Sequence, residues 1–481
     1  MANRFVANAI SYHGKGAINA IPDEVKARGF KKVLVASDPD LIKFGVAAQI
    51  EAVLNGAGIP YEIYSDVKAN PTIGNVQRGV EAYKASGADF IVALGGGSAI
   101  DTAKGIGIVF NNPEFADVKS LEGVADTKKK AVPTFALPTT AGTAAEVTIN
   151  YVIIDEDAKK KMVCVDPNDI PAVAIVDPEL MYSMPKGLTA ATGMDALTHA
   201  IESYITPGAW VMSDMLELKA IEMIAANLKA AVDNGSDPVA REAMSQAQYI
   251  AGMGFSNVGL GIVHSMAHPL GAHYDTPHGV ANALLLPYVM EYNAESPAAP
   301  KYIHIAKAMG VNTDGMTEAE GVKAAVEDAG IAISEIESIG IGTPGTVDKA
   351  KGIISYANNL DFNNVPAVEL MKKEFPDTVI RLENDANCAA LGEALAGSGK
   401  GKNSFVAVTL GTGVGGGIII DNKIYAGFNC AGGELGHMVI EFGGIPCTCG
   451  RRGCLEAYAS ATALIRETRR AMEKHRESKM W

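Results

Sequence analysis

Residues 88–109 read ADFIVALGGGSAIDTAKGIGIV, in which a short apolar run meets a helical one through three consecutive glycines. Similar apolar runs precede turns at KKVLVAS (31–37), VPTFALPTT (132–140) and AVAIVDP (172–178). Helical stretches such as IGNVQRGVEAYKAS (73–86) lie between them. Alternating strands and helices are typical of a parallel sheet covered by helices on both faces. The sequence therefore predicts an α/β fold for this part of the chain.

The pattern changes twice further along the chain. After Pro185 the strand runs give way to long helical segments rich in alanine, methionine and leucine, such as SDMLELKAIEMIAANLKAAV (213–232). From about Ile331 the sequence becomes strand-rich and punctuated by glycine, as in NSFVAVTLGTGVGGGIIIDNKIY (403–425). We expect three domains: an α/β domain over residues 1–181, an all-helical domain over 182–326 and a strand-rich segment over 327–481.

The composition limits the classes of function. The chain has 481 residues, of which 48% are hydrophobic, and a formal net charge of −14. This charge argues against a nucleic-acid partner, which would require clustered lysine and arginine. No apolar run has membrane-spanning length, and the N-terminus lacks the layout of a signal peptide. A cytoplasmic location follows, where the six cysteines should be reduced or metal-bound.

Two loops that follow strand runs are candidate nucleotide sites. Gly95–Ser98 opens a helix, and backbone amides at a helix N-terminus attract phosphate. Pro138–Thr143 is a second loop of this kind. Asp38 ends a strand run, so its carboxylate could accept a hydrogen bond from a ribose hydroxyl, which favours NAD over NADP. An N-cap of the next helix is the alternative role for Asp38.

The helical segment contains metal-type residues at helical spacing. Asp195 and His199 are four residues apart, as are His264 and His268, and His278 follows shortly after. A spacing of four places two side chains on one helix face. A carboxylate with several imidazoles suits Fe(II) or Zn(II), with an open position for substrate. Taken singly, each of these histidines is more often a core residue, but five metal-type residues in two short windows favour a metal site.

The motifs GGGSAIDTAK, PTTAGTAAEVT, ATGMDALTHAIESY and GIVHSMAHPLGAHYDTPHGVANALLLP together resemble the iron-containing alcohol dehydrogenases, over nearly all of residues 1–326. The resemblance implies a Rossmann-like, dehydroquinate synthase-like domain, a helical metal domain that continues beyond this segment in the family, and a homodimer. It implies direct hydride transfer between NAD and a small aldehyde or alcohol of the lactaldehyde and propane-1,2-diol type.

The resemblance also assigns residues. It implies that iron or zinc is bound by Asp195, His199, His264 and His278, and that His268 lies beside the nicotinamide. It places along the NAD cleft Gly96, Gly97, Ser98, Asp101, Thr139, Thr140, Thr143 and Lys161, with Asp38 on the adenosine ribose.

The C-terminal segment has its own chemistry. Gly411–Gly416 satisfies G-x-G-x-x-G, but it lies between two strand runs, so it predicts a glycine hairpin and not a dinucleotide turn. Asp385 in the sequence ENDAN is a candidate general base, although an Asn-Asp pair by itself is usually a turn. His437 precedes Cys447, Cys449 and Cys454. One imidazole and three thiolates match a closed structural zinc site, and a cysteine-rich turn is the alternative.

The sequences GIGTPGTVD, NNLDF, ENDANCAALGE, GTGVGGG, GELGH and CTCGRRGCLE resemble the ROK family of sugar kinases and repressors over about residues 328–466. The resemblance implies part of an actin-like (ribonuclease H-like) α/β lobe, with ATP and magnesium at the hairpin that includes Gly411 and Gly413. It implies hexose contacts from Asn359, Asn384, Asp385, Glu434, His437 and Glu456. The family's opening strand and first phosphate loop have no counterpart here, so we expect phosphoryl transfer to fail.

Three interpretations follow from the two resemblances. The chain is an NAD-dependent alcohol dehydrogenase with an inert appendage, a bifunctional reductase and hexose kinase, or an inactive chimera of two incomplete enzymes. Natural fusions normally keep whole domains, because each domain folds around its own core. We therefore favour the dehydrogenase interpretation over the bifunctional one.

Overall fold

A computed structural model describes residues 2–158, 160–274, 276–329, 338–357, 360, 362–376, 378–395, 397–428 and 430–474. The chain forms two compact units, Met1–Gly330 and Ile331–Trp481. Each unit has its own secondary structure and its own apolar clusters, so the two are described in turn.

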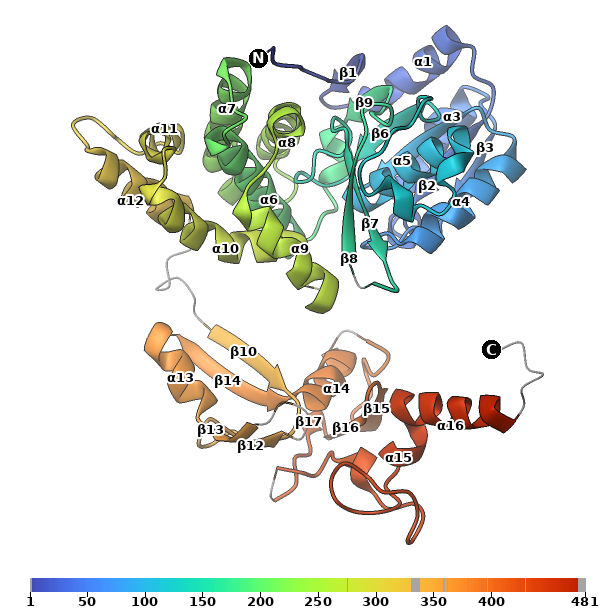
Figure 1. Ribbon diagram of the computed structural model, residues 1–481, viewed down its shortest axis with the longest axis vertical. Helices are drawn as coiled ribbons and strands as arrows, with labels where there is room; N and C mark the ends of the chain where they lie inside the picture. The colour runs from blue at the N-terminus through green and yellow to red at the C-terminus, as the bar shows by residue number, and fades with distance from the viewer. Residues whose placement is uncertain are drawn as a thin grey trace. The chain divides into compact units, whose positions relative to one another are not determined.

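A parallel sheet forms the centre of the α/β part of the first unit (Figure 1). Its strands over the described residues are β1 (Ile10–His13), β2 (Val33–Ser37), β3 (Tyr61–Tyr64), β4 (Phe90–Gly95), β6 (Thr134–Pro138) and β9 (Val173–Val176). Their order in the sheet is β1-β9-β6-β4-β2-β3. The chain moves outward from β2 to β3 and then returns to the other side of β2 for β4. This reversal creates a crevice at the carboxyl ends of β2 and β4, where open α/β sheets bind ligands.

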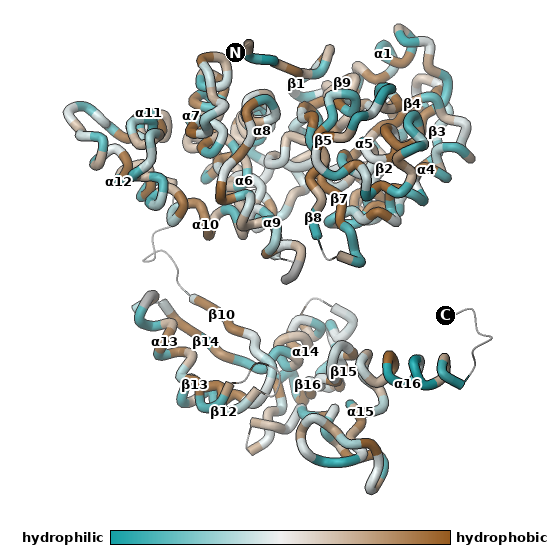
Figure 2. Tube along the Cα trace, in the orientation of Figure 1, coloured by the Kyte–Doolittle hydropathy of each residue, from teal (hydrophilic) through white to brown (hydrophobic). Residues whose placement is uncertain are grey.

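Helices cover both faces of the sheet. They are α1 (Ile21–Arg28), α2 (Pro39–Lys43), α3 (Val46–Gly56), α4 (Ile73–Ser86) and α5 (Gly97–Asn111). Alternate residues of β4 enter opposite apolar clusters: Ile91 and Ala93 pack with α4 and α5, whereas Phe90 and Val92 pack with α1 and α3. Figure 2 shows the central strands as apolar segments. Burial on both faces explains why these strands are continuous apolar runs.

A smaller sheet lies beside the main one and was not predicted from the sequence. It consists of β5 (Gly123–Val124), β7 (Asn150–Asp155) and β8 (Lys160–Val165), and β7 and β8 are antiparallel. Half-buried and buried residues alternate along β7, and β8 shows the same alternation after the exposed Lys160. Lys161 lies on β8.

The remainder of the first unit is helical and lies beside the sheet (Figure 1). Its helices are α6 (Lys186–Ile205), α7 (Val211–Asp233), α8 (Pro238–Val258), α9 (Ile262–Tyr274), α10 (His278–Tyr292), α11 (Tyr302–Ala308) and α12 (Glu318–Ala329). Ile201, Ile221 and Ile224 are buried in their shared core. Over the described residues, none of the helices is long and apolar enough to cross a membrane.

The second unit contains several small sheets. Its strands are β10 (Ser338–Thr343), β11 (Thr346–Asp348), β12 (Ile353–Ala357), β13 (Phe362–Val365), β14 (Val379–Asn384), β15 (Phe405–Leu410), β16 (Val414–Ile420) and β17 (Lys423–Ile424). Its helices are α13 (Ala367–Glu374), α14 (Asp385–Leu395), α15 (Glu456–Ala459) and α16 (Ala461–Lys474). β10 and β14 are parallel, and β15 pairs with β16 as an antiparallel hairpin. This pairing confirms the glycine hairpin predicted at Gly411–Gly416.

Candidate active site and metal centre

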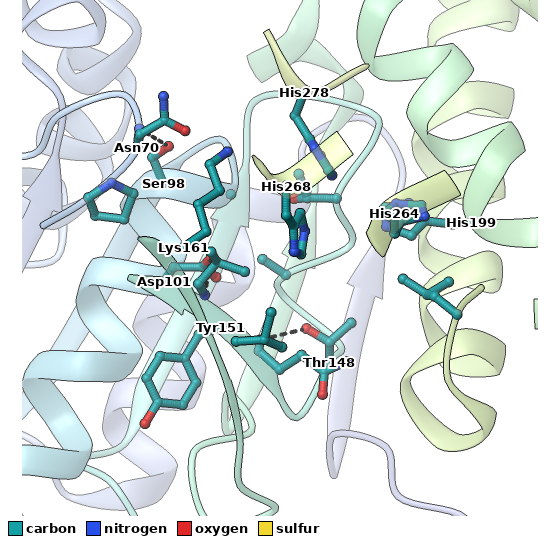
Figure 3. Close-up of a pocket in the computed structure, with 18 of the residues that line it drawn as sticks. Asn70, Ser98, Asp101, Thr148, Tyr151, Lys161, His199, His264, His268 and His278 are labelled. Carbon is teal, nitrogen blue, oxygen red and sulfur yellow. Dashed lines mark hydrogen bonds between the residues drawn. The ribbon is translucent and has the colours of Figure 1, made fainter. Parts of the chain in front are cut away.

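A cavity of about 200 Å³ lies between the sheet and the helices of the first unit. Figure 3 shows Ser98, Asp101 and Lys161 on one side of it. The imidazoles of His268 and His278 approach from the other side, on α9 and α10. The cavity therefore has one wall from the sheet and one from the helices.

The glycine loop (Gly95–Ser98) and the threonine loop (Pro138–Thr143) meet at the carboxyl end of the sheet. The backbone nitrogen of Thr139 donates to the carbonyl of Gly95 at 3.0 Å. A Cβ on Gly97 would lie 2.9 Å from the side chain of Thr143, and one on Gly96 would lie 3.2 Å from that of Thr140. Because side chains would not fit here, the start of α5 presents its backbone amides, as an anion site requires.

The two carboxylate oxygens of Asp38 have separate environments. Its Oδ1 accepts hydrogen bonds from the backbone nitrogens of Asp40 and Leu41, both at 3.0 Å, and so caps α2. Its Oδ2 is directed to the glycine loop, 3.6 Å from where a Cβ on Gly95 would lie. The helix cap and the ribose contact are therefore compatible, because each uses a different oxygen.

Three helices bring the predicted metal ligands together. The candidate ligand atoms of Asp195, His199 and His264 all lie within 4.8 Å of one another, and all three residues are buried. The Nε2 atom of His278 lies 3.6 Å from Asp195 Oδ1. His268 lines the same cavity, with its ring centroid 5.2 Å from that of His278. α6, α9 and α10 therefore converge on one carboxylate.

The environment of the proposed ligands shifts their pKa values. Burial lowers the pKa of His199 to about 3 and that of His278 to about 4. Burial opposes ionisation of Asp195, but the surrounding imidazoles outweigh it and lower the pKa of this carboxyl. At neutral pH Asp195 is thus ionised, and the rings of His199 and His278 are neutral with free electron pairs. Burial opposes protonation of His264, but the carboxylates of Asp195 and Glu202 outweigh it and raise its pKa to about 9, so this ring would release a proton when a divalent metal binds.

The sheet side of the cavity is held by buried polar groups. Asp101 accepts a hydrogen bond from the backbone nitrogen of Val152 at 2.9 Å, and burial raises its pKa to about 6. Lys104 is fully buried and donates to the carbonyl oxygens of Thr148 at 2.6 Å and Asn150 at 2.8 Å. These bonds attach α5 to the segment that leads from the threonine loop into β7.

The second unit brings the four predicted zinc ligands together. The ligand atoms of His437, Cys447, Cys449 and Cys454 lie within 4.8 Å of one another. His437 Nδ1 is 3.6 Å from Cys447 Sγ, and the sulfurs of Cys449 and Cys454 are 3.7 Å apart. This arrangement suits a tetrahedral site for a thiophilic metal.

A cavity of about 1270 Å³ adjoins this cysteine cluster. Its lining includes Asn384, Asp385, Glu434, Glu456 and the turn from Gly411 to Gly416. Glu456 Oε2 accepts from the backbone nitrogen of Val414 at 3.0 Å, which ties the hairpin to the segment after the cysteines. Asn359 lies outside the described residues.

Comparisons with known proteins agree with this geometry. Residues 8–178 match the family described as iron-containing alcohol dehydrogenase, and residues 189–338 match the C-terminal part of that family. Lactaldehyde reductase of Escherichia coli (strain K12) is 56% identical over 327 residues, which cover 68% of this chain and 85% of that protein. The chain belongs to the iron-containing alcohol dehydrogenases.

Other members of this alcohol dehydrogenase family are similar over the same extent. The NAD-dependent methanol dehydrogenase of Bacillus methanolicus is 40% identical, over 68% of this chain and 84% of that protein. The crystal structure of 1,3-propanediol oxidoreductase superposes with a TM-score of 0.66 at 40% identity, and covers 68% of this chain and 85% of that one. Residues 312–480 match the ROK family, which confirms the resemblance. The match is longer than the expected 328–466, and it overlaps the dehydrogenase match over residues 312–338.

Two residues of the dehydrogenase site were missed by the sequence analysis. Asn282 Nδ2 lies 2.7 Å from Asp195 Oδ1 and 3.1 Å from His264 Nε2. Glu202 Oε2 lies 2.6 Å from His264 Nδ1. Both signals were present, because Asn282 follows His278 by four residues and Glu202 follows His199 by three. Neither residue type stands out among ordinary helix residues without the fold.

Proposed function

We propose that the first unit interconverts a small aldehyde and its alcohol with NAD and a divalent metal. The observation that carries the proposal is the placement of Asp195 and three histidines across one cavity from the glycine and threonine loops. A metal at the first group and a dinucleotide at the second would meet in this cavity. The position of Asp38 at the crevice between β2 and β4 supports the choice of NAD over NADP as the dinucleotide.

The donor set fits the proposed metal. Asp195, His199, His264 and His278 would hold it, and one carboxylate with three neutral imidazoles suits either Fe(II) or Zn(II). When bound, the metal supplies Lewis-acid polarisation of the substrate oxygen. The nicotinamide supplies the hydride acceptor or donor. The remaining task of the protein is alignment of the two reactants and exclusion of water.

The cavity suggests a small substrate. Its volume of about 200 Å³ is below the usual range for drug-sized ligands. Phe255 and Leu260 contribute apolar lining on the helical side. The phenyl ring of Phe255 also stacks on His199 at 4.2 Å between centroids, which restricts rotation of that imidazole. A short aldehyde of the lactaldehyde type fits these limits.

The variant His264→Ala tests the proposal. Its metal content and its rate of NADH-linked aldehyde reduction are measured together. We expect both to fall, the rate by at least 100-fold, because the variant loses one of the buried donors. A chain that retains activity without bound metal would refute the metal-dependent mechanism. His304, which contacts Tyr204 at 2.8 Å outside the cavity, offers a matched control. His304→Ala should keep both metal and rate.

For the second unit we propose zinc at His437 and the three cysteines, and weak binding of a hexose beside Asp385. The cysteine cluster and the adjoining cavity support this proposal. ATP-dependent phosphorylation is not expected, because nothing in residues 327–481 corresponds to the first phosphate loop of the ROK family. A coupled ADP-release assay tests this. Sugar-dependent turnover that disappears in Asp385→Asn would overturn it.

A further inference from the structure

The buried carboxylate of Glu202 contacts His264, a proposed metal ligand, on the side of the ring that faces away from the metal site. Glu202 lies on α6, and only 2% of it is exposed to solvent. Its Oε1 accepts from the backbone nitrogen of Val263 at 2.7 Å, and its Oε2 lies 2.6 Å from His264 Nδ1. The backbone nitrogen of His264 also approaches Oε2, at 3.4 Å. A Cβ on Gly261 would come within 2.7 Å of Glu202 Oε1, so the absence of a side chain there makes room for the carboxylate.

These contacts determine which ring nitrogen of His264 faces the site. A carboxylate at 2.6 Å can only accept, so Nδ1 carries the hydrogen. In the neutral ring Nε2 then carries the free electron pair, and it lies 3.7 Å from Asp195 Oδ1. We propose that Glu202 is a positioning residue that fixes the tautomer and ring orientation of His264 and thereby strengthens metal binding. This inference rests on the metal site proposed above.

The other two imidazoles lack such support. Nδ1 of His199 and Nδ1 of His278 are buried, and neither has a carboxylate at hydrogen-bond distance within the described part of the chain. The backbone of Gly142 lies near the His199 ring. His264 is thus the imidazole whose orientation is set in advance by a charged group. Outer partners of this kind typically contribute 10- to 100-fold to metal affinity.

A purely structural role is the competing explanation. Glu202 accepts from backbone nitrogens at the start of α9, so it also acts as a helix cap, and removing a cap destabilises the fold. The two roles make different predictions. A cap changes the stability of the metal-free chain, whereas a positioning residue changes the metal affinity of the folded chain and does so only through His264.

Zn²⁺ titration against a competing chelator distinguishes them. It uses the full metal-free chain, with a parallel Cys447→Ser chain to subtract binding at the cysteine cluster. We expect Glu202→Gln to weaken zinc binding by 10- to 100-fold, because one amide hydrogen must face a donor. Glu217→Gln is the matched control. Glu217 is also fully buried in the helical domain, but its neighbour is the hydroxyl of Ser203 and not a proposed metal ligand.

Combining Glu202→Gln with His264→Ala tests whether Glu202 acts on zinc affinity through His264. In a His264→Ala chain, Glu202→Gln should change the residual zinc affinity by less than 3-fold, because its partner is gone. Equal zinc affinity of Glu202→Gln and the unaltered chain would overturn the inference and leave the metal site standing. Absence of zinc binding at this site in the unaltered chain would instead refute the proposed metal site.

A second measurement needs no altered glutamate, in case Glu202→Gln does not fold. Long-range ¹H–¹⁵N spectra of the zinc-loaded, histidine-labelled chain report the state of each ring nitrogen. The His264 signals are assigned by their loss in His264→Gln. Protonated Nδ1 with metal-bound Nε2 supports the inference, and the opposite pattern overturns it.

Discussion

At the scale of single residues, the dehydrogenase site depends on which atom of each side chain is already occupied. Asp38 uses one oxygen for a helix cap, and Glu202 uses both of its oxygens on α9. Glu217 is the contrasting case, a fully buried carboxyl beside the hydroxyl of Ser203, with no charged partner at hydrogen-bond distance among the described residues. The same residue type therefore supports the site in one place and is a cost to stability in another.

Asp38→Asn separates the two roles of Asp38. The amide keeps an oxygen that can accept from Asp40 and Leu41, so we expect the melting temperature to change little. It removes the negative charge that would repel a 2′-phosphate, so the preference for NAD over NADP should narrow by about 10-fold or more. Ratios of kcat/KM for the two cofactors give the answer. Asp38→Gly, which also loses the side-chain cap, should narrow the preference for NAD and lower the folding stability by only a few tenths of a kcal/mol. An unaltered chain that uses both cofactors equally would refute the role.

Glu217→Gln should raise stability, and the gain should depend on pH. Burial raises the pKa of Glu217 well above its ordinary value. A carboxyl with a raised folded-state pKa contributes most below its unfolded pKa of about 4.5, and this contribution is lost as the pH rises toward the folded-state pKa. Glutamine stays neutral, so its contribution to the folding stability does not change over this pH range. Denaturant unfolding at pH 5 and pH 8 should therefore show a larger advantage for the variant at pH 8. An advantage that is the same at both values would contradict this account.

At the scale of elements, close helix contacts bring the ligands together. Gly279 follows His278 at the start of α10, and a Cβ there would lie 2.0 Å from the carbonyl oxygen of Ala191 on α6. α10 can approach Asp195 only because this position has no side chain. In the same way, Gly252 of α8 lets the helix pack on the threonine loop, where a Cβ would meet that of Ala144 at 2.4 Å.

Gly279→Ala should move α10 away from α6. Overpacking of this kind costs about 1–3 kcal/mol of folding stability. Because His278 is the adjacent residue, we expect zinc or iron affinity to fall as well. Gly187→Ala is the matched control on α6, since a Cβ there meets nothing within 4 Å. It should leave metal binding unchanged and keep or slightly raise stability. Normal metal affinity in Gly279→Ala would show that the close approach does not position His278.

At the scale of the whole molecule, the two proposed metal sites lie in separate units. All described ligands proposed for the dehydrogenase metal lie within Met1–Gly330, and the cysteine cluster lies within Ile331–Trp481. Each unit has an apolar core of its own, although that of the second unit is the smaller one, centred on Val347, Ile354 and Leu382. A small core gains much of its stability from a bound metal.

Cys447→Ser should therefore affect one unit only. We expect bound zinc to fall by one ion per chain, and the second unit to lose its ordered state at a lower temperature. The NADH-linked rate should stay within about 2-fold of the unaltered chain, because no proposed dehydrogenase ligand has changed. Metal analysis and calorimetry, together with the aldehyde assay, check the three outcomes. A loss of dehydrogenase rate in this variant would show that the units depend on one another.

Local sequence determined much of this protein. The apolar runs of β2, β4, β6 and β9 were predictable because strands buried on both faces leave a continuous signal. The pairs Asp195–His199 and His264–His268 were predictable because a spacing of four on a helix places side chains on one face. β1, β3 and the β7–β8 hairpin were not predicted, since half-exposed strands leave a weak pattern.

Only the tertiary structure decided which of these groups meet. His264 Nδ1 and Glu202 are 62 positions apart, and Asn282 and Asp195 are 87 apart. Such contacts depend on how closely α6, α9 and α10 approach, and that distance depends on packing at positions such as Gly279. Short-range periodicity specifies the face of a helix, but it contains no information about the helix that packs against that face. For this reason the proposed metal ligands could be named from the sequence, whereas Glu202, which we propose orients one of them, could be found only in the fold.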